Sequence, residues 1–586
     1  MFDYKFTTYV ISSEPLIPIN KLSPVRLLLS LISSLIVLHM GSAVWSLLMP
    51  PDNGAQRISP SSPPISIDDP PASREPYHLD TSEVLHMHPV SSCDKRTCYV
   101  PHLQLLLTVW AGRVTIESLP YDVLLLIFHF DRVEYLEGFD DIDVDPAWRF
   151  SWWHRLVHVC QSWRSIIFES PHFLDLKLYC GPGTPMELIG IWPRLPIIIR
   201  NAADESTSGY YDFDIAIAHH DRVSEIYLLE LTSSQLGRLA SAMQQRFPEL
   251  IHLMLDFDGY NDTPAPALPD LFLGGSAPSL LSLTLHSIPF PALPNLLSSA
   301  TRLVHLTLVG IPHTGYFSPE AIVTCLSLLT HLESLTIDFE SSLSSPNRES
   351  RRPPPPTRTI LPALTRIEFK GASEYFEGLV AWIDIPLLDS IFITFFHNPI
   401  YDIPHLAQFM GRTARFQASS EAHVSFDLEG VRVGPLRPSR AFDEKTCLRI
   451  LGKGLDQQLS SVAQVSRLFF PSVSTIEHLY IHGPRYLQWE DVENMQWLEI
   501  FEPFVAVKNL YVSKIFVECI ALALQDLVRE RVTDVLPVLE SLFLEGPQPS
   551  GSVQNAIGMF AAARQLIGQP VAVSYLHGTD AYPQRI

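Results

Sequence analysis

From residue 223 onward, a short apolar pattern recurs along the chain, with apolar side chains at relative positions 1, 4 and 6. Positions 4 and 6 share one face of an extended strand, because side chains alternate between the two faces of a strand. Each copy therefore predicts a short strand with one buried face. The ten copies are Val223–Leu228, Leu250–Leu255, Leu280–Leu285, Leu303–Leu308, Leu332–Ile337, Leu364–Phe369, Leu388–Ile393, Ile476–Ile481, Val507–Val512 and Leu539–Leu544.

The spacing of these copies is typical of repeat proteins. Successive copies begin 23–32 residues apart, except for one gap of 88 residues between residues 388 and 476. Repeats of this length bury their apolar faces against their neighbours rather than alone. Inside the long gap, alternation at His423–Phe426 and at Leu448–Ile450 predicts strands of one or two further repeats. Residues 341–356, which end in four prolines, predict a polar loop.

Helical patterns lie between the predicted strands. Leu236, Leu239 and Met243 recur at helical spacing, a second helix is expected after Ser318-Pro319, and Asn555–Ile567 predicts a closing helix. One strand and one helix per repeat, stacked in parallel, predict a curved sheet with helices outside. We therefore predict an α/β fold, an irregular strand-helix solenoid over residues 176–586. An ordinary doubly wound α/β domain is the alternative interpretation.

Two further helical patterns precede the strands, within residues 115–175. Leu119-Pro120 predicts a helix start, because a proline in the first turn loses no hydrogen bond. Val123 and Ile127, with Leu124 and Phe128, recur at four-residue spacing and predict one apolar face. Residues 152–168 predict a second helix with one apolar side, which Pro171 ends. Such short amphipathic helices must pack together or against another chain.

The first 110 residues form a separable extension. Residues 27–49 carry no formal charge, and about 20 apolar residues suffice for a membrane-spanning helix. A membrane anchor here would carry the remaining chain across the bilayer and expose the sequon at Asn261. We favour a buried or peripheral helix, or an extension outside the working protein. Residues 50–89, rich in proline and serine, predict a linker.

Charge and cysteine content limit the functional classes. The formal net charge of −22 argues against a nucleic-acid partner, because Lys and Arg supply most of the affinity for phosphates. The seven cysteines are mostly scattered through apolar stretches, as buried free thiols in a reducing compartment are. We therefore predict a cytoplasmic or nuclear protein; the alternative is a membrane-anchored protein held through residues 27–49.

No sequence pattern predicts an enzyme, a cofactor or a metal site. The chain lacks a phosphate-binding glycine loop, a nucleophile elbow and an HExxH helix. Cys93 and Cys98 have no second ligand pair, and His219-His220-Asp221 predicts a surface turn because adjacent side chains point apart. Residues 141–145 look like the start of a calcium loop, but Pro146 replaces the required glycine.

The helical patterns resemble the F-box, the helical hook that binds the Skp adaptor of cullin-based ubiquitin ligases. Residues 131–149 form an insertion where the family's motif is shorter, and the residues after it are similar to F-box proteins of mushroom-forming fungi. The residues that carry the resemblance are Leu119-Pro120, Val123-Leu124, Ile127-Phe128, Leu156, Val159-Cys160, Trp163-Arg164, Ile167 and Pro171.

This resemblance implies roles for individual residues. Those expected to contact the adaptor are Leu119, Pro120, Leu124, Ile127 and Phe128. Val159 and Trp163 are expected to pack the hook. The strand pattern likewise resembles leucine-rich repeats, although it lacks the asparagine that usually follows the strand.

Together, these patterns predict a non-catalytic recognition protein. The leading hypothesis is a substrate-recognition subunit of a cullin-based ubiquitin ligase, which docks the Skp adaptor through the helical module and a target protein through the repeats. The alternative is a repeat scaffold, membrane-anchored or free, with no ligase association. A third hypothesis, an enzyme within an α/β domain, has no supporting motif.

Overall fold

The computed structural model describes residues 119–137, 152–181, 188–201, 213–258, 264–341, 357–413, 420–434, 446–469, 475–484, 494–528 and 532–576. The chain divides into two compact units, Met1–Asp175 and Leu176–Ile586. Predictions outside the described residues concern the apolar segment 27–49, the linker 50–89, Cys93 and Cys98, the acidic residues 141–145, the sequon at Asn261 and most of the loop 341–356.

The described part of the first unit is a helical module, residues 119–175 with a gap at 138–151. It contains α3 (Tyr121–Glu137), α5 (His154–Val157) and α6 (Gln161–Glu169). Helices α3 and α5 both pack against α6. The carbonyl of Pro120 accepts the first hydrogen bonds of α3, from the amides of Val123 and Leu124 at 3.0 and 3.1 Å. The helix start predicted at Leu119-Pro120 is therefore confirmed.

The second predicted helix is interrupted. Cys160 is extended, with φ −156° and ψ 168°, and its Sγ accepts a hydrogen bond from the amide of Trp163 at 3.5 Å. This sulfur cap starts α6 afresh, so α5 and α6 are separate helices. Helix α6 ends at Glu169, as Pro171 predicts.

The second unit, which we call the sheet unit, is a mixed α/β structure with one large, mostly parallel sheet. Within the described residues the sheet has 16 strands. They are β1 (Leu178–Cys180), β2 (Ile197–Arg200), β3 (Val223–Leu231), β4 (His252–Phe257), β5 (Ser282–His286), β6 (His305–Ile311), β7 (Ser334–Phe339), β9 (Arg366–Gly371), β11 (Ser390–Phe395), β12 (Glu421–Phe426), β13 (Gly430–Gly434), β14 (Thr446–Leu451), β15 (His478–His482), β16 (Asn509–Val512), β17 (Ser541–Glu545) and β18 (Ala572–Leu576).

Every copy of the apolar pattern coincides with one of these strands. Position 4 of successive copies lies side by side: Leu253 pairs with Leu283, and Leu283 with Leu306. The same alignment joins Leu479 to Leu510. These side chains are buried, so the pattern marks one continuous apolar face of the sheet. The strand prediction is confirmed for all ten copies.

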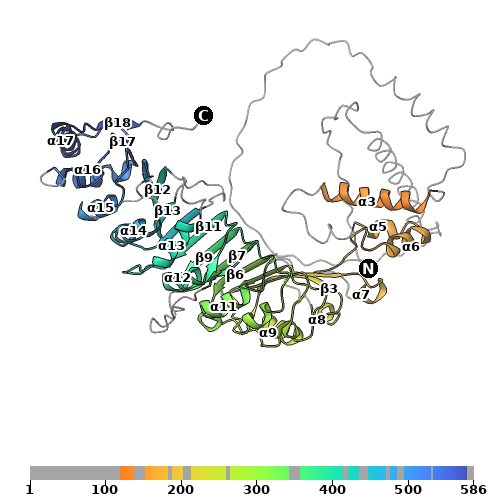
Figure 1. Cartoon of the computed structure of the whole chain (residues 1–586). Coiled ribbons are helices and arrows are strands. Elements are labelled where there is room, and N and C mark those ends of the chain that lie inside the picture. The colour runs from red at the N-terminus through yellow and green to blue at the C-terminus, as the bar shows by residue number, and fades with distance from the viewer. Residues whose placement is uncertain are drawn as a thin grey trace, which may run out of the picture. The chain divides into compact units, whose positions relative to one another are not determined.

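Helices connect the parallel strands and cover the buried face of the sheet (Figure 1). Helix α9 begins with a capping box, in which the Thr232 hydroxyl accepts from the amide of Gln235 and the Gln235 side chain accepts from the amide of Thr232. The helices of the unit are α7 (Leu188–Ile191), α8 (Asp214–Ile217), α9 (Ser233–Ala242), α10 (Leu293–Leu297), α11 (Pro319–Leu326), α12 (Ser373–Trp382), α13 (Pro404–Arg412), α14 (Leu455–Phe469), α15 (Asn494–Phe501), α16 (Val517–Asp526) and α17 (Ser552–Leu566).

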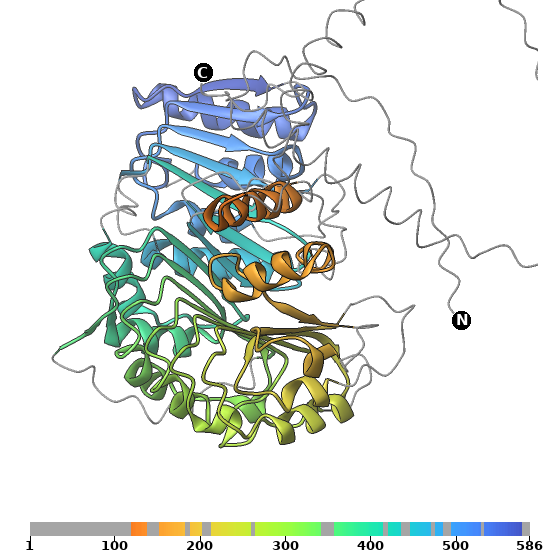
Figure 2. The same ribbon diagram turned by 90° about the vertical axis from the view of Figure 1, so that its right-hand side faces the viewer.

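The strand order departs from the chain order at one place. The sheet runs β11-β14-β13-β12-β15, with β13 antiparallel to both of its neighbours. Strands β12 and β14 were predicted from their alternation, but β13 and the reversed order were not. Figure 2, turned by 90° from Figure 1, shows the strands following one another along the sheet unit. The long gap in the pattern therefore holds an inserted antiparallel hairpin.

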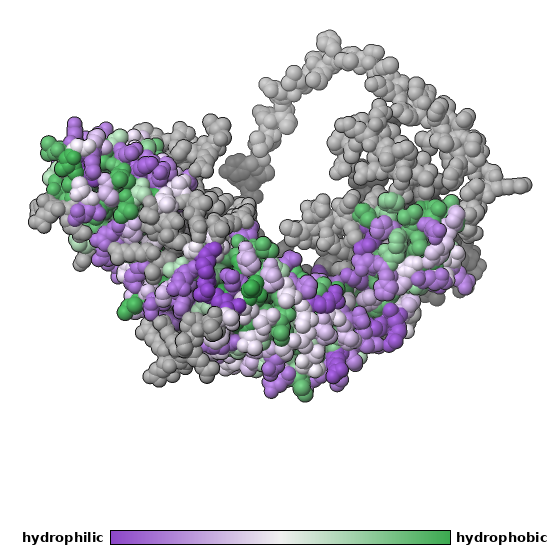
Figure 3. All heavy atoms as spheres, in the orientation of Figure 1, coloured by the Kyte–Doolittle hydropathy of each residue, from purple (hydrophilic) through white to green (hydrophobic). Residues whose placement is uncertain are grey.

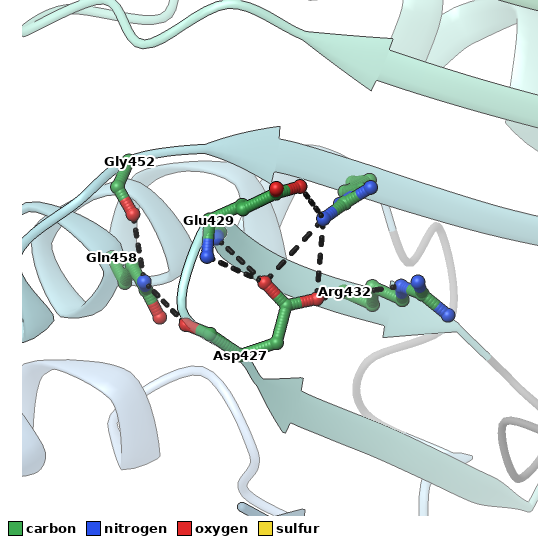
Figure 4. Close-up of polar contacts among 7 residues, drawn as sticks. Asp427, Glu429, Arg432, Gly452 and Gln458 are labelled. Atoms are coloured by element: carbon green, nitrogen blue, oxygen red, sulfur yellow. Dashed lines mark hydrogen bonds and ion pairs between the residues drawn. The ribbon is translucent and has the colours of Figure 1, made fainter. Parts of the chain in front are cut away.

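The turn of this hairpin is fixed by a polar network (Figure 4). The Asp427 carboxylate accepts hydrogen bonds from the amides of Glu429 and Gly430 at 2.9 and 2.8 Å, and it also pairs with Arg449. The buried side-chain amide of Gln458 donates to the carbonyls of Asp427 and Gly452 at 3.0 and 2.7 Å. Helix α14 thereby ties the hairpin turn to the end of β14, since its Gln458 satisfies a carbonyl of each.

The centre of the sheet unit is filled by a row of aromatic rings. Phe369 lies between Phe339 and Phe395 on the neighbouring strands, with ring centroids 6.3 Å from each. Phe376 of α12 stacks on it at 4.7 Å, and Tyr375 at 5.8 Å. All five side chains are buried, so strand and helix layers meet through these rings.

The end of the described chain differs from the prediction. The expected closing helix is present as α17, but a further strand, β18, follows it and pairs in parallel with β17. Within the described residues, no helix combines the length and apolar character needed to cross a bilayer.

Candidate protein-docking surfaces

Helix α3 is apolar on two faces, and one of them is turned into the helical module. Leu124, Ile127 and Phe128 are buried there, with Phe128 completely inaccessible. The Phe128 ring meets the edge of Trp163 on α6, with centroids 4.8 Å apart. This contact joins the two longest helices of the module.

The other face of α3 is exposed. Tyr121, Val123, Leu126 and Phe130 are each 39–49% accessible, and Figure 3 shows apolar side chains gathered over this helix. Val123, Leu126 and Phe130 lie three and four residues apart, so they form one stripe along the helix. Phe173, 50% accessible, adds a further exposed ring to the module. Apolar side chains grouped in this way on a small module are typical of a binding surface.

Polar contacts hold α3 in place at its first residue and in its second half. Tyr121 shares a 2.5 Å hydrogen bond with Ser170, just beyond α6. Both carboxylate oxygens of Asp131 accept hydrogen bonds from the Arg155 guanidinium at 2.7 Å. These ties are partly exposed and add little stability individually, but they fix which face of α3 points outward.

The residues predicted to contact the adaptor differ in their exposure to solvent. Leu119 is partly exposed and Pro120 is exposed, so both remain available to a partner. Leu124, Ile127 and Phe128 are buried within the module instead. The apolar run Val123–Phe128 has no polar side, so the sequence alone could not tell which face is buried. The exposed Leu126 and Phe130 were missed for this reason.

The prediction for Val159 is wrong, whereas Trp163 packs the module as expected. Val159 is 40% accessible, and Trp163 is 1% accessible. A continuous helix would place both on one side, but the break at Cys160 turns Val159 out to solvent.

His154 makes the module sensitive to acid. Burial, and to a lesser extent the nearby charge of His158, lowers the pKa of His154 below its usual value of 6.5. Near pH 6.5 the His154 side chain therefore takes up a proton more readily in the unfolded chain than in the folded module. The free energy of unfolding consequently falls as the pH drops below 6.5. Hydrogen exchange of the α5 and α6 amides at about pH 7.5 and about pH 5.5 measures this loss. We expect His154→Gln to abolish it; an equal loss in both proteins would contradict this role of His154.

No family model matches the chain, and no curated protein shows significant similarity to it.

A second surface is the face of the sheet opposite the helices. In the first half of the sheet unit, Thr284, Thr307 and Thr336 lie side by side on β5, β6 and β7, each half-buried. In the row next to them, Ser282 and Ser334 lie on either side of His305. This part of the face presents hydroxyl groups, which donate or accept hydrogen bonds as a partner requires.

In the second half of the unit, the same row is aromatic. His423, Tyr480, Tyr511 and Phe543 stack ring on ring across four neighbouring strands, with centroids 4.3–4.5 Å apart. Burial raises the pKa of the Tyr511 hydroxyl above its usual value. His423, Tyr480 and Tyr511 are only 4–7% accessible, so Phe543, which is half-buried, is the most exposed ring of the row. The signal for this row was an aromatic residue at position 5 of the last three copies of the pattern.

Charged side chains on this face are largely neutralised by ion pairs between strands. Lys177 pairs with Glu225 at 2.7 Å, and Lys370 with Asp338 at 3.1 Å. Burial raises the pKa of Asp338, although Lys370 opposes this shift. Arg200 lies over the ring of Tyr227 at 4.0 Å. Because these charged side chains already have partners within the sheet, this face favours polar and aromatic contacts with a partner protein over attraction by net charge.

The described residues hold no group of three or more His, Cys, Asp or Glu side chains placed to bind a metal. His219-His220-Asp221 lies in turns, as predicted, where the His220 Nδ1 is 2.8 Å from the carbonyl of Arg246 and Asp221 pairs with Arg194.

Proposed function

We propose that this chain is the substrate-recognition subunit of a cullin-based ubiquitin ligase. The helical module docks a Skp-type adaptor, and the sheet unit holds a target protein. The observation that carries the proposal is the exposed apolar stripe of α3, which begins directly after Leu119-Pro120 on a small, tightly packed helical unit.

The burial pattern changes which residues we assign to the adaptor contact. Leu119 and Pro120 keep the role that the resemblance implies. The exposed Val123, Leu126 and Phe130 take the place of the buried Leu124, Ile127 and Phe128, whose role becomes the packing of α3 against α6.

For the sheet unit, we propose a leucine-rich-repeat-like solenoid. Strand and helix alternate along most of the unit, neighbouring strands pair in register, and helices lie along one side of the sheet. Such an arrangement leaves the strand face open for a protein partner. Phe543, the half-buried ring at the end of the aromatic row, supplies the accessible aromatic side chain of this face, and aromatic side chains often dominate the binding energy of protein interfaces.

In this function the chain supplies proximity and no catalytic group. Holding the target beside the ubiquitin carrier turns an encounter between molecules into one within a complex, which raises the effective concentration of the target lysine. The other subunits of the ligase carry out the transfer.

The test is the affinity of the full chain for a purified Skp-type adaptor, measured by calorimetry. Leu126→Asp places a charge in the centre of the stripe, and we expect it to weaken binding about 30-fold or more, as loss of about 2 kcal/mol at a central contact does. The matched control is Leu271→Asp, a change at a 60% accessible leucine of the sheet unit, which should leave the affinity unchanged.

A folded native chain without measurable adaptor affinity would contradict the proposal and favour a repeat scaffold without ligase association. Equal weakening by Leu126→Asp and Leu271→Asp would contradict the assignment of the α3 stripe.

A further inference from the structure

The two edges of the sheet unit are unlike. At one edge, β1 is only three residues long, and Lys177, which directly precedes it, forms an ion pair with Glu225 of β3. At the other edge, β18 is five residues long, contains no proline and no charge, and is accessible or half-accessible throughout. Proteins normally protect sheet edges by shortness, charge or proline, because an open edge pairs with other strands. The β18 edge has none of these protections.

The segment that forms this edge carries little charge, although Glu545 of β17 pairs in register with Leu576 and the exposed Glu540 lies beside Ala572. In residues 551–576 the only charged side chain is Arg564, which is completely buried and donates hydrogen bonds to the carbonyls of Leu536 and Pro537. The exposed side of α17 instead carries Leu566, 88% accessible, and Met559, 48% accessible. A chain with a net charge of −22 repels its own copies least where they meet through elements that carry little charge.

The strand is complementary to itself. When two copies of β18 pair antiparallel with Ser574 opposite Ser574, Ala572 lies opposite Leu576 and Val573 opposite Tyr575. Each pair then joins a small or β-branched residue to a large one, and a β-branched residue opposite an aromatic ring is a favourable cross-strand pair. The two serines can share a hydrogen bond on the two-fold axis.

We propose that a second copy of this chain pairs with the β18 edge, antiparallel, about a two-fold axis at Ser574. A two-fold axis normal to the sheet extends the sheet from one copy into the next and brings the two α17 helices together on the same face. The dimer is independent of the adaptor contact, which lies on the other unit of the chain.

Cysteine cross-linking tests the register directly. In the paired strands the two Ser574 Cα atoms lie about 4.5–5.5 Å apart, within the range that a disulfide spans. In the full chain, we expect Ser574→Cys, a nearly isosteric change, to form a covalent dimer under mild oxidation on a non-reducing gel. Val573→Cys is the matched control, because its two copies lie diagonally, more than about 7 Å apart, and cannot be bridged.

Sedimentation of the uncross-linked full chain tests the dimer itself. The native chain should be dimeric at micromolar concentration, and Ser574→Lys should raise the dimer dissociation constant at least tenfold, since two ammonium groups would face each other on the axis. Leu328→Lys, at a 46% accessible leucine elsewhere on the unit, should leave it unchanged. A monomeric native chain, cross-linking by Val573→Cys as efficient as by Ser574→Cys, or a Ser574→Lys dimer of native stability would each overturn the proposal.

Discussion

Replacing Phe369 with alanine should lower the free energy of unfolding of the sheet unit by about 4 kcal/mol, the middle of the range for a buried Phe→Ala change. Phe369 is 1% accessible and contacts Phe339, Phe376 and Phe395. Its loss removes apolar surface from the core and leaves a cavity. This cavity cannot collapse, because β9 is held between strands β7 and β11. Urea unfolding followed by circular dichroism measures the change.

The matched control is Phe392→Ala, the same substitution on the neighbouring strand β11. Phe392 points to the open face of the sheet and is only half-buried, so we expect a loss of about 1 kcal/mol. Equal losses at the two positions would contradict the assignment of Phe369 to the centre of the core.

Trp163→Ala should destabilise the helical module by about 4 kcal/mol, enough to unfold it in a large fraction of molecules. The 1% accessible ring of Trp163 packs on Phe128, and the module is too small to bury its apolar faces by other contacts. Hydrogen exchange of the α3 and α6 amides should accelerate strongly, while the amides of the sheet unit keep their native protection.

A conservative replacement separates packing from polar interactions at this position. The indole Nε1 of Trp163 makes no hydrogen bond to any described residue. Trp163→Phe therefore removes only part of the ring and should restore most of the protection that Trp163→Ala loses. If phenylalanine were no better than alanine, the ring contact with Phe128 would not be what holds α3 in place.

The sequence predicts the strands of the sheet unit well because their signal is local and repeated. Except across the long gap, the apolar residue at position 4 of each copy pairs with the same position of the next copy, so the repeated pattern predicts ten strands and most of their register. The reversed hairpin was not predictable in this way. Its antiparallel order depends on the contacts of Gln458 and Asp427, which are more than 30 residues apart in the sequence.

For the helical module, composition located the helices but not their inner faces. The run Val123–Phe128 is apolar throughout, and only the contact with Trp163 selects Phe128 for the interior. The break at Cys160 depends on a sulfur cap, for which the usual Ser, Thr, Asp or Asn signal is absent. The exposed position of Val159 therefore could not be read from helical spacing.

The reversed strand order determines when each strand can find its sheet partner during translation. As the chain leaves the ribosome, strands β2 to β7, β9 and β11 can each pair with a strand that is already made, but β11 acquires its next neighbour only when β14 emerges. Residues 396–445 are made in between, which takes a few seconds at about 5–20 residues per second. During that interval the nascent sheet ends in an open edge carrying Phe392. Chaperone contact with this chain should therefore peak while residues 396–445 are being translated, after which β12, β13 and β14 can dock onto β11 as a ready-made meander.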